Sequence, residues 1–293
     1  MIPKIISIIA VWDEQQMIGL SIASTKDIVY QYIILIKKGT SDKTIEVIKY
    51  CEKLWNLNMI ILESELKLRD RRKRGIDISK KYADFYLIQD GDEIYRDTNS
   101  ILKLISDGYT FCYTSIIFLE KDLLHTPKDE NLAWLIPHPF LFKNTKDIFW
   151  PKSGDMPCCN INMYRHNIYN TGEKNNPFKF DCKIKNFKRI FLREVFTEWH
   201  ESDYKGTIEE FADENHHTVK WYRENIDKNL SLDEIIEKYN IFLNSNEEEK
   251  FKWHEIYDEN KYIPYPDIIK KFISFGKLEG IKNIEDLHYL DQL

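Results

Sequence analysis

The apolar run from Ile5 to Val11, which contains four isoleucines, constrains the fold more than any other feature of the chain. Because it lacks a regular alternation of polar and apolar residues, it is typical of a parallel strand buried on both faces of a sheet. Shorter apolar segments follow at residues 32–36, 59–62 and 85–89, and stretches with helical spacing separate them. Parallel strands joined by helices form right-handed crossovers, so the first hundred residues predict an open α/β sheet.

The connections between these strands carry helical signals. We expect helices at residues 17–23 and 75–82, and another that is capped by Thr98 and ends at Gly108. The helix that follows the second strand has its apolar stripe on Ile45, Ile48, Cys51 and Leu54.

A basic run from Lys67 to Arg74 precedes the helix that is expected at Gly75. The N-terminus of a helix beside cationic side chains is suited to binding phosphate. The alternative interpretation is a solvated run of charges, which in some proteins binds nucleic acid.

The pattern changes after Tyr109, where residues 109–120 alternate and indicate an added strand or hairpin. Residues 125–180 hold most of the prolines, and we expect loops and short strands there. From about residue 185 the chain is expected to be mostly helical. It has a capping box from Ser231 to Glu234 and an amphipathic helix from Asp267 to Phe275.

The overall composition excludes some classes of protein. Hydrophobic residues make up 43% of the 293 residues, which is enough for a sizeable core. The formal net charge of −6 argues against broad, sequence-independent binding to nucleic acid. The five cysteines form no C-x-x-C pair, so we expect a cytoplasmic, reducing environment and neither a disulfide framework nor a structural zinc site. The first apolar run is too short to cross a membrane, and peripheral attachment to a membrane stays open.

Two carboxylates follow the predicted strand at residues 85–89, in the segment Asp90-Gly91-Asp92. Ligands collect at the carboxyl ends of strands in open α/β sheets. Hard divalent cations prefer carboxylate oxygens, and they can neutralise the charge that develops on a diphosphate leaving group. An isolated pair of this kind is more often an acidic surface turn, but the buried strand directly before it favours a metal site.

The segment from Asp84 to Glu93 resembles the D-Y-x-x-x-x-D-x-D-E element of family 2 glycosyltransferases with the GT-A fold. Three other segments are similar to elements of that family and occur in the same order. They are Ile5 to Glu14 (first strand and acidic pair), Gly39 to Thr44 (G-S-T-D-x-T turn) and Arg72 with Gly75-Ile76 (A-R-N-x-G-I element). The resemblance covers roughly residues 3–150.

This resemblance implies a GT-A type α/β fold, with a mostly parallel Rossmann-like sheet flanked by helices. It implies a catalytic domain over residues 1–225, with a nucleotide half at 1–108 and an acceptor half at 109–225, and a helical C-terminal extension at 226–293. The implied activity is metal-dependent transfer of a sugar, with inversion, from a UDP- or GDP-sugar to a hydroxyl group of a glycan or another acceptor. The implied metal is Mn²⁺ or Mg²⁺.

The resemblance also implies roles for individual residues. Asp90, Asp92 and His200 are expected to bind the metal, and Asp181 or Asp155 is expected to take the proton of the acceptor hydroxyl. The residues expected to bind the donor are Ala10, Trp12, Glu14, Asp42, Arg72 and Asp90.

Two other functions stay open at this point. Lys37 and Lys38 stand where the family has two acidic residues, which raises the alternative of a non-catalytic binding protein that keeps the fold but has lost the donor site. The basic run raises a second alternative, a glycosyltransferase that acts on nucleic acid, although the acidic net charge argues against it.

Overall fold

The computed structural model describes residues 3–120, 134–146, 254–260, 265–275 and 284–293, with shorter segments at 123, 125–127, 148–149, 158–159, 168–170, 179–183, 223, 227–231, 233–234 and 237. Within these ranges, no helix has both the length and the apolar character needed to cross a membrane. Cys51 and Cys112, the two cysteines whose side chains are described, are buried free thiols.

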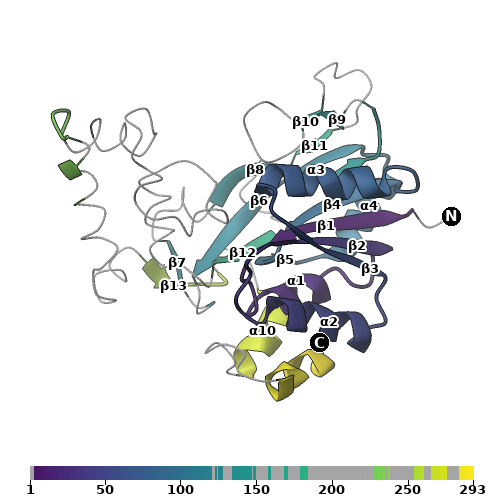
Figure 1. The fold of residues 1–293 in the computed structure, drawn as a ribbon, viewed down its shortest axis with the longest axis horizontal. Coiled ribbons are helices and arrows are strands. Elements are labelled where there is room, and N and C mark those ends of the chain that lie inside the picture. Colours follow the sequence, from purple (N-terminus) through teal and green to yellow (C-terminus); the bar gives the residue numbers. More distant parts are fainter. Residues whose placement is uncertain are drawn as a thin grey trace.

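A nine-stranded sheet forms the centre of the described structure (Figure 1). Four of its strands are parallel neighbours, in the order β3 (Met59–Ser64), β2 (Gln31–Lys37), β1 (Ile5–Val11) and β4 (Phe85–Asp90). These strands coincide with the four apolar segments of the sequence. The predicted α/β fold, with a mostly parallel sheet flanked by helices, is therefore confirmed.

The other strands extend the sheet beyond β4. β8 (Trp134–Lys143) pairs antiparallel with both β4 and β6 (Phe111–Glu120), so the added strand or hairpin expected at residues 109–120 is present as the single strand β6. β6 is in turn parallel to β11 (Ile168–Asn170) and β12 (Lys179–Lys183), and β12 pairs antiparallel with β5 (Glu93–Tyr95). Two small antiparallel sheets join β9 (Ile148–Phe149) to β10 (Cys158–Cys159), and β7 (His125–Pro127) to β13 (His254–Ile256).

Helices cover both faces of the parallel strands, because side chains alternate along each strand and both sets are apolar. On one face, α3 (Leu68–Ser79) packs its Ile76 and Ile78 with a cluster that includes Ile8 and Leu35. On the other face lie α1 (Ile18–Ala23), α2 (Thr44–Leu54) and α4 (Thr98–Ser106). The result is the three-layer arrangement seen in Figure 1, with α3 on one side and α1 and α2 on the other.

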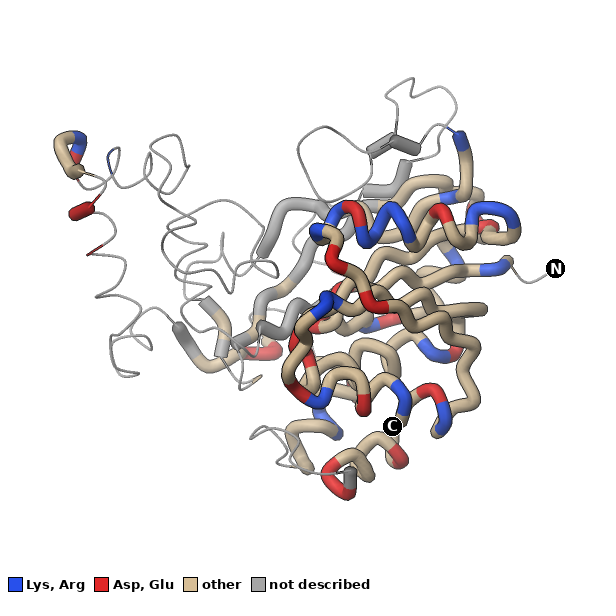
Figure 2. The backbone as a smooth tube through the Cα atoms, viewed as in Figure 1, with Lys and Arg blue, Asp and Glu red and all other residues tan. Residues whose placement is uncertain are grey.

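Helix α3 begins seven residues earlier than the sequence predicted, at Leu68 instead of Gly75. The prediction was wrong because Gly75 was interpreted as a helix start, whereas it lies inside the helix at a close contact with the sheet. A Cβ atom at Gly75 would lie 2.7 Å from Cγ2 of Ile8. The basic run consequently forms the first two turns of α3, which are mainly blue with a red residue among them in Figure 2.

Of the two predicted N-terminal caps, the one at Thr98 was wrong by one residue and the capping box is present. Helix α4 is capped by Asp97, one residue before the predicted Thr98, because the Asp97 carboxylate accepts a hydrogen bond of 3.1 Å from the Ser100 amide. The capping box is confirmed, since the Ser231 amide donates to the Glu234 carboxylate (2.8 Å) and the Glu234 amide donates back to the Ser231 hydroxyl (3.3 Å).

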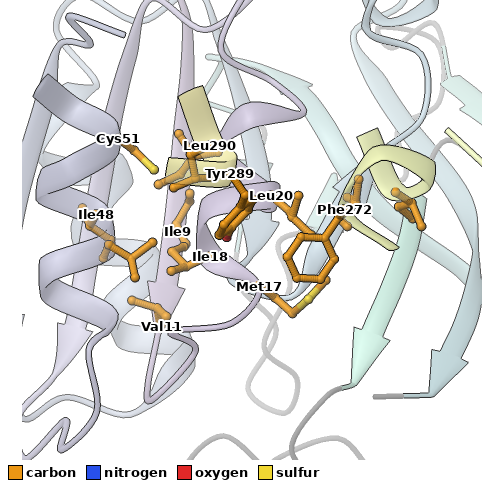
Figure 3. Close-up of a cluster of buried hydrophobic side chains, with 14 of the residues drawn as sticks. Ile9, Val11, Met17, Ile18, Leu20, Ile48, Cys51, Phe272, Tyr289 and Leu290 are labelled. Carbon is orange, nitrogen blue, oxygen red and sulfur yellow. The ribbon is translucent and has the colours of Figure 1, made fainter. Parts of the chain in front are cut away.

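The described helices near the C-terminus pack on the N-terminal half of the chain. They are α10 (Asp267–Ser274) and the 3₁₀ helix η5 (Ile284–Gln292). Phe272, Tyr289 and Leu290 belong to the same buried cluster as Ile9 of β1 and Ile18 of α1 (Figure 3). Residues more than 240 positions apart in the sequence therefore share one core. The domain boundary at residue 226 stays a prediction.

Candidate active site

Three adjacent parallel strands end at one edge of the sheet. β1 ends at Val11, β2 ends at Lys37, and β4, which neighbours β1, ends at Asp90. The turn that follows β4, Asp90-Gly91-Asp92-Glu93, is called the carboxylate turn below. Because ligands bind at the carboxyl edge of open α/β sheets, this turn is placed where a ligand site is expected.

The carboxylate turn is closed by its own last residue. The Glu93 carboxylate accepts a hydrogen bond of 2.9 Å from the Asp90 amide. Gly91 packs so closely on the chain after β1 that a Cβ atom there would lie 2.9 Å from Val11 Cγ2 and 3.0 Å from Glu14 Cγ. A glycine is therefore required between the two aspartates because there is no space for a side chain, and Glu14 lies against the turn.

Arg72 forms an ion pair with Asp90 across this edge. Arg72 lies on the first turns of α3, is 3% exposed, and donates from Nη2 to the Asp90 carboxylate. Asp90 points to the α3 face of the sheet, next to Ala10, its partner in the register of β1 and β4. The structure thus brings together three of the predicted donor-binding residues.

Arg71 points into the same part of the protein and is fully buried. Its Nη1 donates to the carbonyl oxygens of Val11 (2.9 Å) and Leu35 (3.4 Å), near the ends of β1 and β2. The interpretation of the whole basic run as a solvated surface is therefore wrong for Arg71 and Arg72, which point inward, while Lys73 and Arg74 are exposed. The family resemblance had singled out Arg72, but nothing in the sequence separated Arg71 from Lys73 and Arg74, because the helix boundary had been placed at Gly75.

Hydrogen bonds connect the chain after β1 to the start of α2. Asp13 adopts a left-handed backbone conformation (φ 50°), which aspartate tolerates, and its carboxylate accepts a hydrogen bond of 2.7 Å from the Ser41 amide. Asp42 accepts hydrogen bonds from the amides of Gln15 (3.2 Å) and Thr44 (3.0 Å). The Glu14 amide donates to the Thr44 hydroxyl (2.6 Å). Asp42 therefore fixes the loop that carries Trp12 and Glu14.

Trp12 follows β1 directly and lies beside the end of the neighbouring strand β2. The ammonium nitrogen of Lys37 stands 5.7 Å from the centre of a Trp12 ring, within the range of a cation–π contact. The two side chains are half-buried. Trp12, one of the residues expected to bind the donor, therefore lies beside a cation.

The second aspartate of the turn, Asp92, is 6% exposed. Strand β5 begins directly after it and pairs with β12, and this pairing puts Asp181 opposite Glu93 in the backbone register. The predicted proton acceptor Asp181 therefore lies opposite the residue that follows Asp92 in the sequence. The other predicted late-sequence residues, Asp155 and His200, lie outside the described residues.

The charge of the site affects Tyr95, which lies two residues beyond Glu93. Burial raises the pKa of Tyr95 well above its ordinary value, and the negative charges of Glu93 and Asp90 act in the same direction. The hydroxyl therefore stays protonated and donates a hydrogen bond of 2.9 Å to the carbonyl oxygen of Ile88. Tyr95 serves as a support for β4 just before the carboxylate turn.

The donor atoms in the carboxylate turn suit a hard divalent cation. Within the described ranges there is no group of three or more His, Cys, Asp and Glu side chains that could hold a metal ion. Mg²⁺ and similar cations are commonly held by one or two carboxylates, with substrate phosphates and waters supplying the other ligands. Asp90 and Asp92 supply two carboxylates of this kind, and Arg72 is ion-paired with Asp90.

Sequence reasoning missed Gln89 and Ser21, which lie directly beneath the carboxylate turn. Gln89 is fully buried, and its amide donates to the carbonyl (2.7 Å) and hydroxyl (2.8 Å) oxygens of Ser21. The Ser21 hydroxyl in turn donates to the carbonyl oxygen of Asp90 (2.9 Å). A signal was present in the sequence, because Gln89 is the one polar residue in the apolar segment 85–89.

Comparisons with known proteins give no close relative. No protein-family model matches the chain, and no curated protein matches it. Similar solved structures include Staphylococcus aureus TarS 1–349 in complex with UDP, at 12% identity and a TM-score of 0.41, covering 85% of this chain and 78% of that one. Another is 4-diphosphocytidyl-2C-methyl-D-erythritol synthase from Anaerococcus prevotii, at 13% identity and a TM-score of 0.34, covering 48% of this chain and 72% of that one.

A third similar structure is a mannosyltransferase from Pyrobaculum calidifontis in complex with GDP-Man and Mn²⁺. It is 12% identical, with a TM-score of 0.30, and the match covers 41% of this chain and 36% of that one. Likenesses at this level carry no argument about activity. The functional conclusion therefore depends on the sequence elements and on the geometry of the carboxylate turn.

Proposed function

We propose that the protein is a transferase that uses a nucleotide sugar and moves the sugar to a hydroxyl acceptor with the help of Mn²⁺ or Mg²⁺. The observation that carries this proposal is the position of the carboxylate turn. Two aspartates that resemble the D-x-D element lie at the carboxyl edge of the sheet, and Arg72, from another element of the resemblance, is ion-paired with the first of them.

In this proposal the donor lies along the edge formed by β1, β2 and β4. Trp12 contacts the nucleobase, while Glu14 and Asp42 shape the nucleotide pocket. Asp90 and Asp92 would hold the cation. A bound divalent cation supplies charge that stabilises the diphosphate as it leaves. Arg72, which is ion-paired with Asp90, would contribute a second positive charge to the diphosphate.

The reaction needs a base for the acceptor. The acceptor oxygen forms a bond to the anomeric carbon as the bond from that carbon to the diphosphate oxygen breaks, and the hydroxyl proton passes to a carboxylate. We assign this role to Asp181, because the register of β12 and β5 places it opposite Glu93. Attack from the side opposite the leaving group would invert the anomeric centre.

A thermal-shift screen tests the proposal first. A ligand that binds the native state raises the melting temperature, so UDP, GDP and their sugars are each added with and without Mn²⁺. We expect stabilisation by one nucleotide family that requires Mn²⁺. The same mixtures are then analysed for slow hydrolysis of the sugar nucleotide to free sugar and nucleoside diphosphate.

The outcomes separate the proposal from its alternatives. Metal-dependent binding with hydrolysis supports a transferase, and hydrolysis should disappear in Asp92→Asn. Nucleotide binding without hydrolysis would support a non-catalytic binding protein if Asp92→Asn binds the nucleotide as well as the wild type does. A glycosyltransferase for nucleic acid would label or shift a mixed DNA and RNA oligonucleotide pool, and we expect no shift.

A further inference from the structure

A buried hydrogen-bond network centred on Gln89 lies beneath the carboxylate turn, on the face of the sheet opposite Arg72. Gln89 and Asp90 are successive residues of β4, so their side chains point to opposite faces. The Gln89 side chain points to α1, where Ser21 lies, and the Asp90 side chain points to α3.

Both the oxygen and the nitrogen of the Gln89 side-chain amide form hydrogen bonds. Its oxygen accepts hydrogen bonds from the hydroxyls of Ser7 (3.1 Å) and Thr25 (3.3 Å). Its nitrogen donates to the carbonyl and hydroxyl oxygens of Ser21 and, at 3.4 Å, to the carbonyl oxygen of Glu93. The acceptors around the nitrogen include two backbone carbonyls, so the amide has one orientation that satisfies its partners.

The network contacts both ends of the carboxylate turn. At the first residue, the Ser21 hydroxyl donates to the carbonyl oxygen of Asp90 at 2.9 Å. At the last residue, the Gln89 nitrogen contacts the carbonyl oxygen of Glu93. The backbone on either side of Asp92 is therefore tied to one rigid, buried group.

An apolar residue would be expected at position 89, because β4 is buried on both faces of the sheet. A buried amide costs free energy unless its hydrogen bonds are made, so its presence requires the five partner atoms around it to be placed together. Fully satisfied buried networks impose one geometry on the groups they connect. Here the connected groups are the two ends of the turn that carries the proposed metal ligands.

We propose that Gln89 is a positioning residue, which fixes the carboxylate turn so that Asp90 and Asp92 present their carboxylates to a divalent cation and its nucleotide ligand. This inference rests on the proposed function of the turn. Groups that orient metal ligands from behind typically change metal affinity by about 10- to 100-fold when they are removed.

Two variants and one control test the inference. Gln89→Met keeps an unbranched side chain of similar length and removes every hydrogen bond of the amide. Ser21→Ala removes the link to the Asp90 carbonyl without changing β4. Tyr32→Phe is the control, because its equally buried hydroxyl belongs to the far end of the network, with bonds to Thr25 (2.9 Å) and Ile22 (3.2 Å) and none to the turn.

Two readouts are measured on the full chain. Hydrogen exchange of a peptide covering residues 90–95 reports the order of the turn, and calorimetric titration with UDP or GDP at several Mn²⁺ concentrations reports the metal requirement. We expect faster exchange at residues 90–95 and about 10- to 100-fold weaker Mn²⁺-dependent binding in Gln89→Met and Ser21→Ala. We expect Tyr32→Phe to lose thermal stability while both readouts stay as in the wild type.

Failure of this inference is distinct from failure of the proposed function. If the wild-type protein does not bind either nucleotide with Mn²⁺, the proposed function falls and the metal-positioning role falls with it. If the wild type binds and Gln89→Met and Ser21→Ala bind equally well, with unchanged exchange at residues 90–95, the positioning role is overturned. An equal loss in Tyr32→Phe would also overturn it, because the network would then act through general stability.

Discussion

The ion pair between Arg72 and Asp90 gives a prediction whose size follows from burial. Removing one partner of a buried pair costs about 3–5 kcal/mol, and an exposed pair contributes about 0–1 kcal/mol. The Arg72 side chain is 4% exposed and that of Asp90 is 22% exposed. Because water reaches one partner in part, we expect a coupling free energy of about 2–3 kcal/mol, between these limits.

A double-mutant cycle measures this coupling directly. Urea unfolding is followed for Arg72→Met, Asp90→Asn, the double variant and the wild type, with unchanged m-values required for the comparison. Arg74→Met is the control, since Arg74 is an exposed arginine on the same helix and is expected to change stability by less than about 0.5 kcal/mol. A coupling below about 0.5 kcal/mol would refute the reasoning, because the pair would then behave as an exposed one.

Three further predictions concern packing and capping. Gly91→Ala should lose about 1–3 kcal/mol in urea unfolding, since its Cβ would lie 2.9 Å from Val11; no loss would contradict the close contact. Leu290→Ala should lose about 2–5 kcal/mol in the same assay, because Leu290 is fully buried in the shared core; a loss below about 1 kcal/mol would indicate that η5 is dispensable.

Asp97→Ala should lose about 1 kcal/mol at neutral pH through its cap of α4. Burial opposes ionisation of Asp97, but hydrogen bonds from Ser100 outweigh it and lower the pKa, so this contribution is present above the unfolded pKa of about 3.9 and is lost as the pH falls through the folded value. A loss that does not change with pH would contradict this reasoning.

The parallel half of the fold was readable from sequence because each strand is a continuous apolar run. Strands that are buried on both faces lose the alternation of polar and apolar residues and appear as short apolar runs rich in β-branched residues, bounded by polar or turn residues. Predicted strands and observed strands agree to within two residues from Ile5 to Asp90. The place of the carboxylate turn followed from the end of one such run.

Helix α3 shows where local patterns were insufficient. Arginine and lysine are good helix formers, yet the run from Lys67 to Arg74 was interpreted as a segment before the helix. Whether a given arginine points inward depends on the face of the helix on which it lies. That face could not be assigned while the start of the helix was placed at Gly75. The ion pair of Arg72 and the buried position of Arg71 therefore became visible in the structure alone.

The packing of the C-terminal helices was beyond sequence reasoning for a different reason. The Tyr50 hydroxyl donates to the carboxylate of Asp291 (2.7 Å), a contact between residues 241 positions apart. No local pattern specifies which distant surface an amphipathic helix covers. Gln89 was missed for a third reason. Its polar character was visible in the sequence, but its hydrogen-bond partners on α1 were not.

Calorimetric titration with a nucleoside diphosphate is the sharpest test of our proposal that Asp90 and Asp92 hold a divalent cation needed for nucleotide binding. Wild type, Asp92→Asn and the exposed control Asp107→Asn are titrated with UDP and with GDP, with Mn²⁺ and with a chelator. We expect Mn²⁺-dependent binding of one nucleotide by the wild type and the control, and loss of that binding in Asp92→Asn with the melting temperature retained. Equal affinity with and without Mn²⁺, or full Mn²⁺-dependent binding by Asp92→Asn, would contradict it.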